Sequence, residues 1–202
     1  MAEAFVNVTE GSGKKLRAYD RSIGGNTVLE EGMFLAEQNM ASFTCSPVAG
    51  VSIATANDHT FELMAGASLN LYLRRIEVYQ LVAATTAAFC QFIVYRITTA
   101  GTGGTVQTVT ALDNADTAGA TVMTLPTVKG TETFRIWNGT CVVTQTVPVA
   151  GGPTKLADIY FDPKSKVNRV PAGTANGIAL KCITAVAAAT VVFNVTWGEA
   201  NF

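Results

Sequence analysis

The segment LNLYLRRIEVYQ, residues 69–80, decides the fold class of this chain. Apolar side chains alternate with polar ones up to Leu73, and the alternation resumes at Ile76 with the opposite parity. Alternation indicates a β-strand with one buried face, and a one-residue slip reverses which side chains face inward. A β-bulge at Arg74 and Arg75 would keep both apolar sets in the core and turn one arginine outward. The segment therefore predicts a long, bulged β-strand.

Further strand-like segments recur along the chain at a spacing of about ten residues, without a long helical period between them. Residues 89–97 are apolar on both faces, so we expect both faces to be covered. Turn-forming residues separate the segments, among them NGT at 138–140. The pattern predicts an all-β fold, an antiparallel β-sandwich with the jelly roll as its leading form. The other predicted strands are residues 61–65, 106–111, 121–125, 133–137, 141–149, 156–161, 178–184 and 190–197.

The N-terminal part differs from the rest of the chain. Charged residues concentrate in it, glycines interrupt it and no sustained periodicity runs through it. We therefore expect an extended N-terminal arm over residues 1–45 and one β-sandwich domain over residues 46–202. The arm could be a solvated tail, but apolar residues such as Leu29 and Phe34 are too frequent for a disordered segment. The alternative that we favour is an arm that packs against a neighbouring subunit.

Composition excludes several classes of protein. The net charge is −1 and only 14% of the residues are charged, which argues against a nucleic-acid partner. The most apolar stretch, residues 81–94, is too short to cross a membrane, and the first residues do not resemble an export signal. The four cysteines have neither disulfide-scaffold nor zinc spacing, so we expect buried, reduced thiols and synthesis inside a cell.

Residues that could carry chemistry are few. His59 is the single histidine, so a general base there is less expected than a polar residue at a turn or strand end. Asp113, Asn114 and Asp116 offer oxygens to Ca²⁺, but their spacing is not that of an EF-hand and suits a turn. Trp137 could stack on a sugar or close the edge of a core. We expect no catalytic residue, cofactor or metal site.

Contacts with other proteins are therefore the candidate function. The basic run in the arm could lie on an acidic subunit surface or simply be solvated. The residues that we expect to take part in contacts are Lys14, Lys15, Arg17, Arg21, Phe34, Arg74, Arg75 and Trp137.

Three segments carry a family resemblance: MAGASLNLYLRRIEVYQ (64–80), FIVYRITTAGTGGTVQTVTALDNADTAGATVMTLPT (92–127) and GIALKCITAVAAATVVFNVTWGE (177–199). This chain resembles the small β-sandwich structural proteins of tailed-bacteriophage virions, in particular capsid decoration (cement) proteins. The resemblance implies a homotrimer that binds the major capsid protein or another virion protein and stabilises the shell by bridging capsomers. It also implies synthesis in the bacterial cytoplasm and a place on the capsid surface. The alternative is a head or tail appendage, that is a fibre, adaptor or receptor-binding module, that contacts a host glycan or another virion protein.

Overall fold

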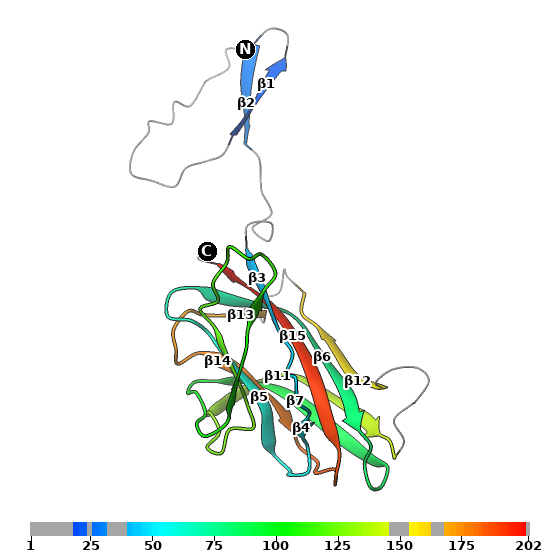
Figure 1. Cartoon of the computed structure of the whole chain (residues 1–202). Helices are drawn as coiled ribbons and strands as arrows, with labels where there is room; N and C mark the ends of the chain where they lie inside the picture. The colour runs from blue at the N-terminus through cyan, green and yellow to red at the C-terminus, as the bar shows by residue number, and fades with distance from the viewer. Residues whose placement is uncertain (1–17, 24–25, 32–39, 146–153, 163–167, 201–202) are drawn as a thin grey trace. The chain divides into compact units, whose positions relative to one another are not determined.

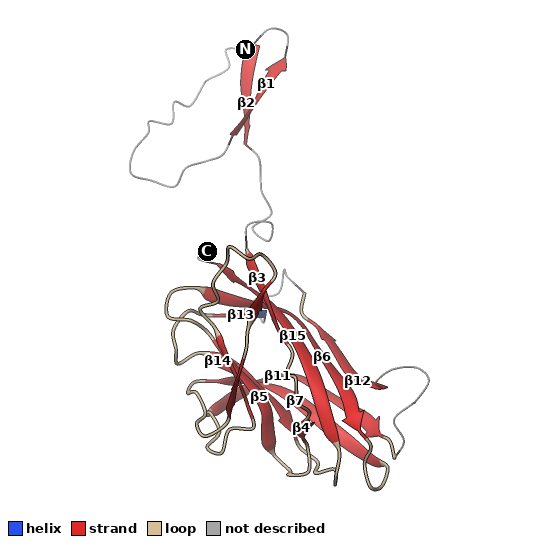
Figure 2. Ribbon diagram, in the orientation of Figure 1, coloured by secondary structure: helices blue, strands red, loops and turns tan. Residues whose placement is uncertain are grey.

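The computed structural model describes residues 18–23, 26–31, 40–145, 154–162 and 168–200 (Figures 1 and 2). The chain divides into two compact units, Met1–Gln38 and Asn39–Phe202, and each is described by itself. The strands are β1 (Ala18–Ile23), β2 (Asn26–Glu31), β3 (Ala41–Cys45), β4 (Val51–Ser52), β5 (Asp58–Met64), β6 (Asn70–Val82), β7 (Ala88–Ile97), β8 (Thr105–Gln107), β9 (Thr110–Ala111), β10 (Thr121–Thr124), β11 (Glu132–Val143), β12 (Thr154–Tyr160), β13 (Arg169–Val170), β14 (Gly177–Cys182) and β15 (Thr190–Ala200).

The second unit is an antiparallel β-sandwich, which confirms the predicted fold class (Figure 2). One sheet has the strand order β11-β7-β14-β5-β10-β8, and the other has the order β12-β6-β15-β3-β9. The short strands β13 and β4 extend the second sheet by pairing with β6 and β15. No helix in the described part of the chain is long and apolar enough to cross a membrane.

The longer strands of the sandwich pair in a nested order. The central pair in the chain, β7 and β11, is antiparallel, and β6 pairs with β12 around it. In the same way β5 pairs with β14, and the outermost strands β3 and β15 pair with each other. These four pairs follow one another as in a single long hairpin. Its closed end is the β7–β11 pair, and its open end is the β3–β15 pair.

The predicted bulge lies in β6, where its pairing with β15 shifts register. Thr196 is opposite Arg75 and Trp197 is opposite Leu73, so Arg74 is the extra residue. Both apolar sets of β6 are buried, including Leu73 on one side of the bulge and Ile76 on the other. Arg75 is exposed, as the slip in the pattern predicted.

The core lies between the two sheets and contains the largest buried side chains of the sandwich. The rings of Phe61 and Phe193 lie 4.4 Å apart between centroids, and those of Phe43 and Trp197 lie 6.0 Å apart. The indole N–H of Trp197 is satisfied by the buried carboxylate of Glu199, to which it donates over 3.0 Å. A buried tryptophan needs such a partner because burial removes its N–H from water.

Two of the predicted strand boundaries are wrong. The NGT sequence at 138–140 is not a turn, because β11 runs through it and Gly139 pairs with Phe92 of β7. Residues 106–111 are not one strand either. They divide into β8, which pairs with β10 in the first sheet, and β9, which pairs with β3 in the second. Residues 146–149 of another predicted strand lie outside the described residues.

The predicted domain boundary at residue 45 is also wrong, because the sandwich begins earlier. β3 is hydrogen-bonded to β15, and its Phe43 is fully buried in the core. Within the first unit, β1 and β2 form an antiparallel hairpin in a segment that we expected to be irregular. Gly24–Gly25 between them is a composition that two-residue hairpin turns favour.

Candidate interaction surface

The structure distributes the predicted contact residues unevenly. Lys14, Lys15, Arg17 and Phe34 lie outside the described residues, and for Arg21 only its backbone place in β1 is described. Arg74 and Arg75 lie in β6, and Trp137 lies in β11 of the other sheet. The two sheets contact each other through their edge strands β11 and β12. Residues of β11 therefore lie in the same region as residues of β12 and of its neighbour β6.

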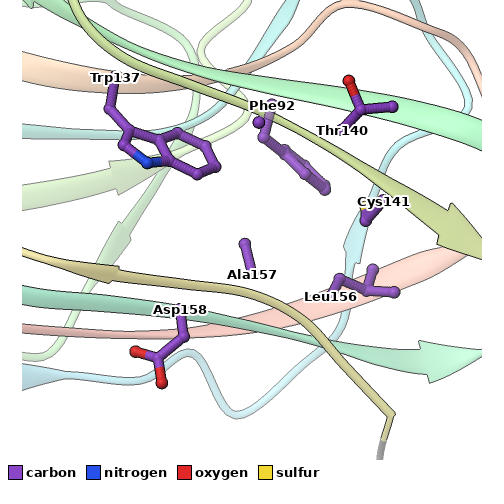
Figure 3. A pocket seen from close by; sticks show the side chains of 8 residues that line it. Phe92, Trp137, Thr140, Cys141, Leu156, Ala157 and Asp158 are labelled. Carbon is purple, nitrogen blue, oxygen red and sulfur yellow. The ribbon is translucent and has the colours of Figure 1, made fainter.

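That side, which we call the open side, is where edge strand β11 of one sheet faces edge strand β12 of the other. A hollow of about 200 Å³ lies between them. Figure 3 shows the rings of Trp137 and Phe92 and the Cys141 side chain across the hollow from Ala157 and Leu156. A second hollow of about 410 Å³ lies further along the same side, where the first residues of β11 face β13.

Trp137 forms a wall of the first hollow and packs on its own strand. A Cβ built on Gly139 would overlap the six-membered ring of Trp137, so the indole lies over the glycine two residues away. Trp137 is partly buried and packs against the main core cluster. This position corresponds to a residue that closes the edge of a core. Glycine at 139 leaves room for the aromatic ring of Trp137.

Apolar side chains are exposed around the start of β7 and along β11. Phe89 of β7 is 72% exposed and lies directly opposite Val142 of β11, which is 47% exposed. Phe134, at the other end of β11, is 58% exposed and lines the second hollow. Further along the outer face of β7, Ile93 and Ile97 are buried. The predicted covering of both faces of β7 therefore holds for its second half and fails at Phe89.

The backbone edge of β11 adds to this surface. β11 pairs with β7 on one side, and no described strand pairs with its other side. Register shifts interrupt its first half, whereas Trp137–Val143 pairs regularly with Val94–Ala88. An unpaired, regular edge presents free N–H and C=O groups to which another strand can add, and proteins usually protect such edges.

Arg75 belongs to a network of charges on the outer face of β6 and β12. Its guanidinium binds both carboxylate oxygens of Asp158, over 2.8 and 2.7 Å. Lys155 contacts the carboxylates of Asp158 and Glu77, and Arg75 also contacts Glu77. The hydrogen bond from Arg75, followed by that from Lys155, lowers the pKa of Asp158 well below its ordinary value. The network keeps Arg75 paired and its side chain ordered.

His59 lies in a second ionic cluster, on the outer face of the first sheet. Its side chain is fully buried, with Nδ1 2.7 Å from a Glu62 oxygen and Nε2 2.9 Å from a Glu132 oxygen. Each ring nitrogen of His59 thus lies within hydrogen-bond distance of a carboxylate oxygen. Lys181 donates to Glu132 over 2.8 Å, so two acids and two bases are paired. A histidine enclosed in this way holds the fold together and does not face a substrate.

Glu62 connects this cluster to two loops. Its carboxylate accepts backbone hydrogen bonds from Gly101 over 2.6 Å and from Gly130 over 2.8 Å. Burial raises the pKa of Glu62, but the hydrogen bonds from His59, Gly130 and Gly101 outweigh it, so the pKa lies below its ordinary value. The charged carboxylate therefore fixes both loops to the sheet. Sequence analysis missed this role because Glu62 alternates with apolar residues like any outward-facing polar residue.

Asp113, a candidate ligand for Ca²⁺, takes part in a turn. Asp113 accepts a hydrogen bond from the backbone N–H of Ala115 over 3.0 Å, the geometry of an Asx turn. Within the described ranges no group of three or more His, Cys, Asp or Glu side chains could hold a metal ion. All four cysteines are free thiols.

Comparison of the chain with protein-family models, with curated proteins and with solved structures gave no significant match.

Proposed function

We propose that this protein is a structural subunit of a tailed-phage virion, a capsid decoration or cement protein that assembles through the open side of its sandwich. The observation that carries the proposal is the regular edge of β11, with which no strand of the described residues pairs, next to the exposed pair Phe89 and Val142. Exposed apolar side chains beside a free strand edge are suited to burial against another protein, because the edge supplies hydrogen bonds and the side chains supply apolar area.

The strand order supports the fold that the resemblance implies. In each sheet four longer strands lie side by side, β12-β6-β15-β3 in one and β11-β7-β14-β5 in the other. Their nested pairing, first with last and central with central, is the pairing that a jelly roll would have. The jelly roll is an eight-stranded double sheet found in viral capsid domains, in lectins and in cupins. We infer this topology for the sandwich and, with it, a place among virion proteins.

The position of Trp137 favours a cement protein over a glycan-binding appendage. A sugar-stacking tryptophan presents its ring face to solvent, whereas one face of the Trp137 ring lies over Gly139 and the side chain packs against the core. The buried state of His59 similarly favours a role without catalysis. The second copy of the chain and the shell protein are the partners that we propose, and a homotrimer is the expected assembly.

The proposal is tested by the variant Phe89→Ser, with Val106→Ser as its matched control. Val106 is 69% exposed and lies in β8, the opposite edge strand of the same sheet. Complete burial of a phenylalanine contributes about 1.5–3 kcal/mol, so covering the 72% that is exposed contributes roughly 1–2 kcal/mol at each contact. We expect Phe89→Ser to weaken association by about 5- to 30-fold at each contact and Val106→Ser to leave it unchanged.

Two measurements decide the outcome: sedimentation of the purified protein, and its binding to phage shells that lack it. Trimers that bind shells, with loss of both properties in Phe89→Ser, would support the proposal. A monomer at all accessible concentrations that ignores shells would overturn it. Equal effects of the two substitutions would also overturn it, because the contact would then not lie at the open side.

A further inference from the structure

Three of the four cysteines form a row across neighbouring strands of the first sheet. Cys141 of β11 is directly opposite Cys90 of β7, and Cys182 lies on β14 at the other side of β7. The Sγ atoms of Cys90 and Cys182 are 3.2 Å apart, and the Cys141 thiol donates to the carbonyl oxygen of Cys90 over 3.6 Å. Cys90 is thus the middle thiol, with one neighbour on each side.

Among the hollows of the described residues, the one between β11 and β12 adjoins one thiol of the row. Cys141 is partly buried and lines the hollow between β11 and β12, where Figure 3 shows it beside Leu156. Cys90 and Cys182 are fully buried, and so is Cys45, which lies in the other sheet on β3. An oxidant that enters the hollow therefore reaches Cys141 first.

Hydrogen bonds within the row lower the pKa of both outer thiols, Cys141 and Cys182, and raise the pKa of the middle thiol, Cys90. A hydrogen bond from Cys90 lowers the pKa of Cys141 and outweighs burial, which raises it. Burial alone raises the pKa of Cys45 to about 11. Because the thiolate is the nucleophile in thiol oxidation, Cys141 combines access with a lowered pKa, whereas Cys182 has a lowered pKa without access and Cys45 has neither.

We propose that Cys141 is a hydroperoxide-reactive thiol and that Cys90 is its resolving partner, so that oxidation joins β11 to β7 by a disulfide. In the first step the Cys141 thiolate attacks one oxygen of the hydroperoxide. The S–O bond forms, the O–O bond breaks, and the leaving oxygen takes a proton as water or an alcohol. In the second step the Cys90 thiol attacks the sulfur of the sulfenic acid and gives up its proton. The S–S bond forms, the S–O bond breaks, and hydroxide leaves as water after taking the second thiol proton.

Backbone geometry selects Cys90–Cys141 over Cys90–Cys182 despite the short contact between the latter sulfurs. Directly opposite residues of an antiparallel pair have Cα atoms about 4.5–5.5 Å apart, inside the range of about 4.4–6.8 Å that disulfides tolerate. Cys182 is opposite Phe92, two residues from Cys90, so the Cys90–Cys182 pair is diagonal. Diagonal neighbours are about 7–8 Å apart, too far for a bond without movement of the backbone.

The experiment treats the reduced full-length protein with hydrogen peroxide, blocks the remaining thiols by alkylation and identifies linked peptides by mass spectrometry. We expect two of the four thiols to be lost and the peptides carrying Cys90 and Cys141 to be linked. Cys141→Ser should keep its three thiols reduced, with loss at least about 10-fold slower than in the wild type. Cys45→Ser and Cys182→Ser, the matched controls, should still form the bond.

A second variant separates the two steps. In Cys90→Ser, the sulfenic acid on Cys141 has lost its partner, so a sulfenic-acid probe such as dimedone should label Cys141. Four intact thiols in the treated wild type would overturn the proposal. So would a Cys90–Cys182 bond in the wild type with Cys141 still reduced, or oxidation that proceeds at the wild-type rate in Cys141→Ser while circular dichroism shows that variant folded.

Discussion

Replacement of Glu62 by Gln should destabilise the sandwich strongly although it changes only one atom. Glu62 is 1% exposed, and its carboxylate accepts hydrogen bonds from His59, Gly101 and Gly130. Hydrogen bonds to a charged group contribute about 1.5–3 kcal/mol each. Glutamine keeps one oxygen, and its NH₂ must face at least one of the three donors. Removing one partner from a buried ion pair costs about 3–5 kcal/mol, and we expect a loss in this range.

The assay is unfolding in urea, followed by the fluorescence of the buried Trp197, with Glu132→Gln as control. Glu132 shares the His59 partner but is 27% exposed, so water can replace part of what it loses. We expect about 1–2 kcal/mol for Glu132→Gln. Hydrogen exchange at the amides of Gly101 and Gly130 should accelerate by at least about 100-fold in Glu62→Gln, because their acceptor is weakened.

The same variant predicts a pH dependence with a definite sign. The pKa of Glu62 is lower in the folded protein than its ordinary value of 4.5. Its contribution is therefore present above pH 4.5 and is lost as the pH falls through the folded pKa. Below pH 4.5 the stability of the wild type should fall more steeply than that of Glu62→Gln. A loss under 1 kcal/mol at neutral pH, with unchanged protection of both glycine amides, would refute the reasoning.

Two further predictions concern the β-strands. Deletion of Arg74 removes the bulge and sets the apolar side chains before and after it on opposite faces of β6, so we expect no soluble folded protein. The control, Arg74→Ala, should change the free energy of unfolding in urea by less than about 0.5 kcal/mol. A stable, native-like deletion variant would show that the register of β6 is not set by its core face. Gly139→Ala places a methyl group against the Trp137 ring, and we expect a loss of about 1–3 kcal/mol with a red-shifted Trp137 emission, measured in a Trp197→Phe background. Unchanged emission and stability would mean that the indole does not rest on the glycine.

Periodicity in the sequence was enough for the fold class and for the bulge at Arg74, because both follow from which side chains must be buried. Periodicity and turn signals gave a wrong prediction where the same residue type occurs both in turns and within strands. Asn138-Gly139 is a turn signal, but here the glycine makes room for the ring of Trp137, a contact that periodicity does not encode. The strand containing Phe43 was missed because its partner, β15, is far away in the sequence.

The candidate site was harder to predict for a related reason. Arg75 and Trp137 were expected to be contact residues on separate grounds, and the sequence could not show that β12 lies between them. Likewise, His59 could not be assigned to an ionic cluster, since Glu132 and Lys181 are brought to it from other strands. Spacing along the chain gives no information on such pairs, and only the sheet order supplies it.

The nested pairing has a consequence for biosynthesis. Thr44 donates a hydrogen bond to Asn194 across a sequence separation of 150 residues. At translation rates of about 5–20 residues per second, β3 waits roughly 8–30 s on the ribosome before β15 is made. During that interval the ring of Phe43 lacks Trp197, the aromatic partner against which it packs, so the newly made chain is exposed to aggregation. We therefore expect the yield of folded protein to depend on the chaperone supply of the producing cell.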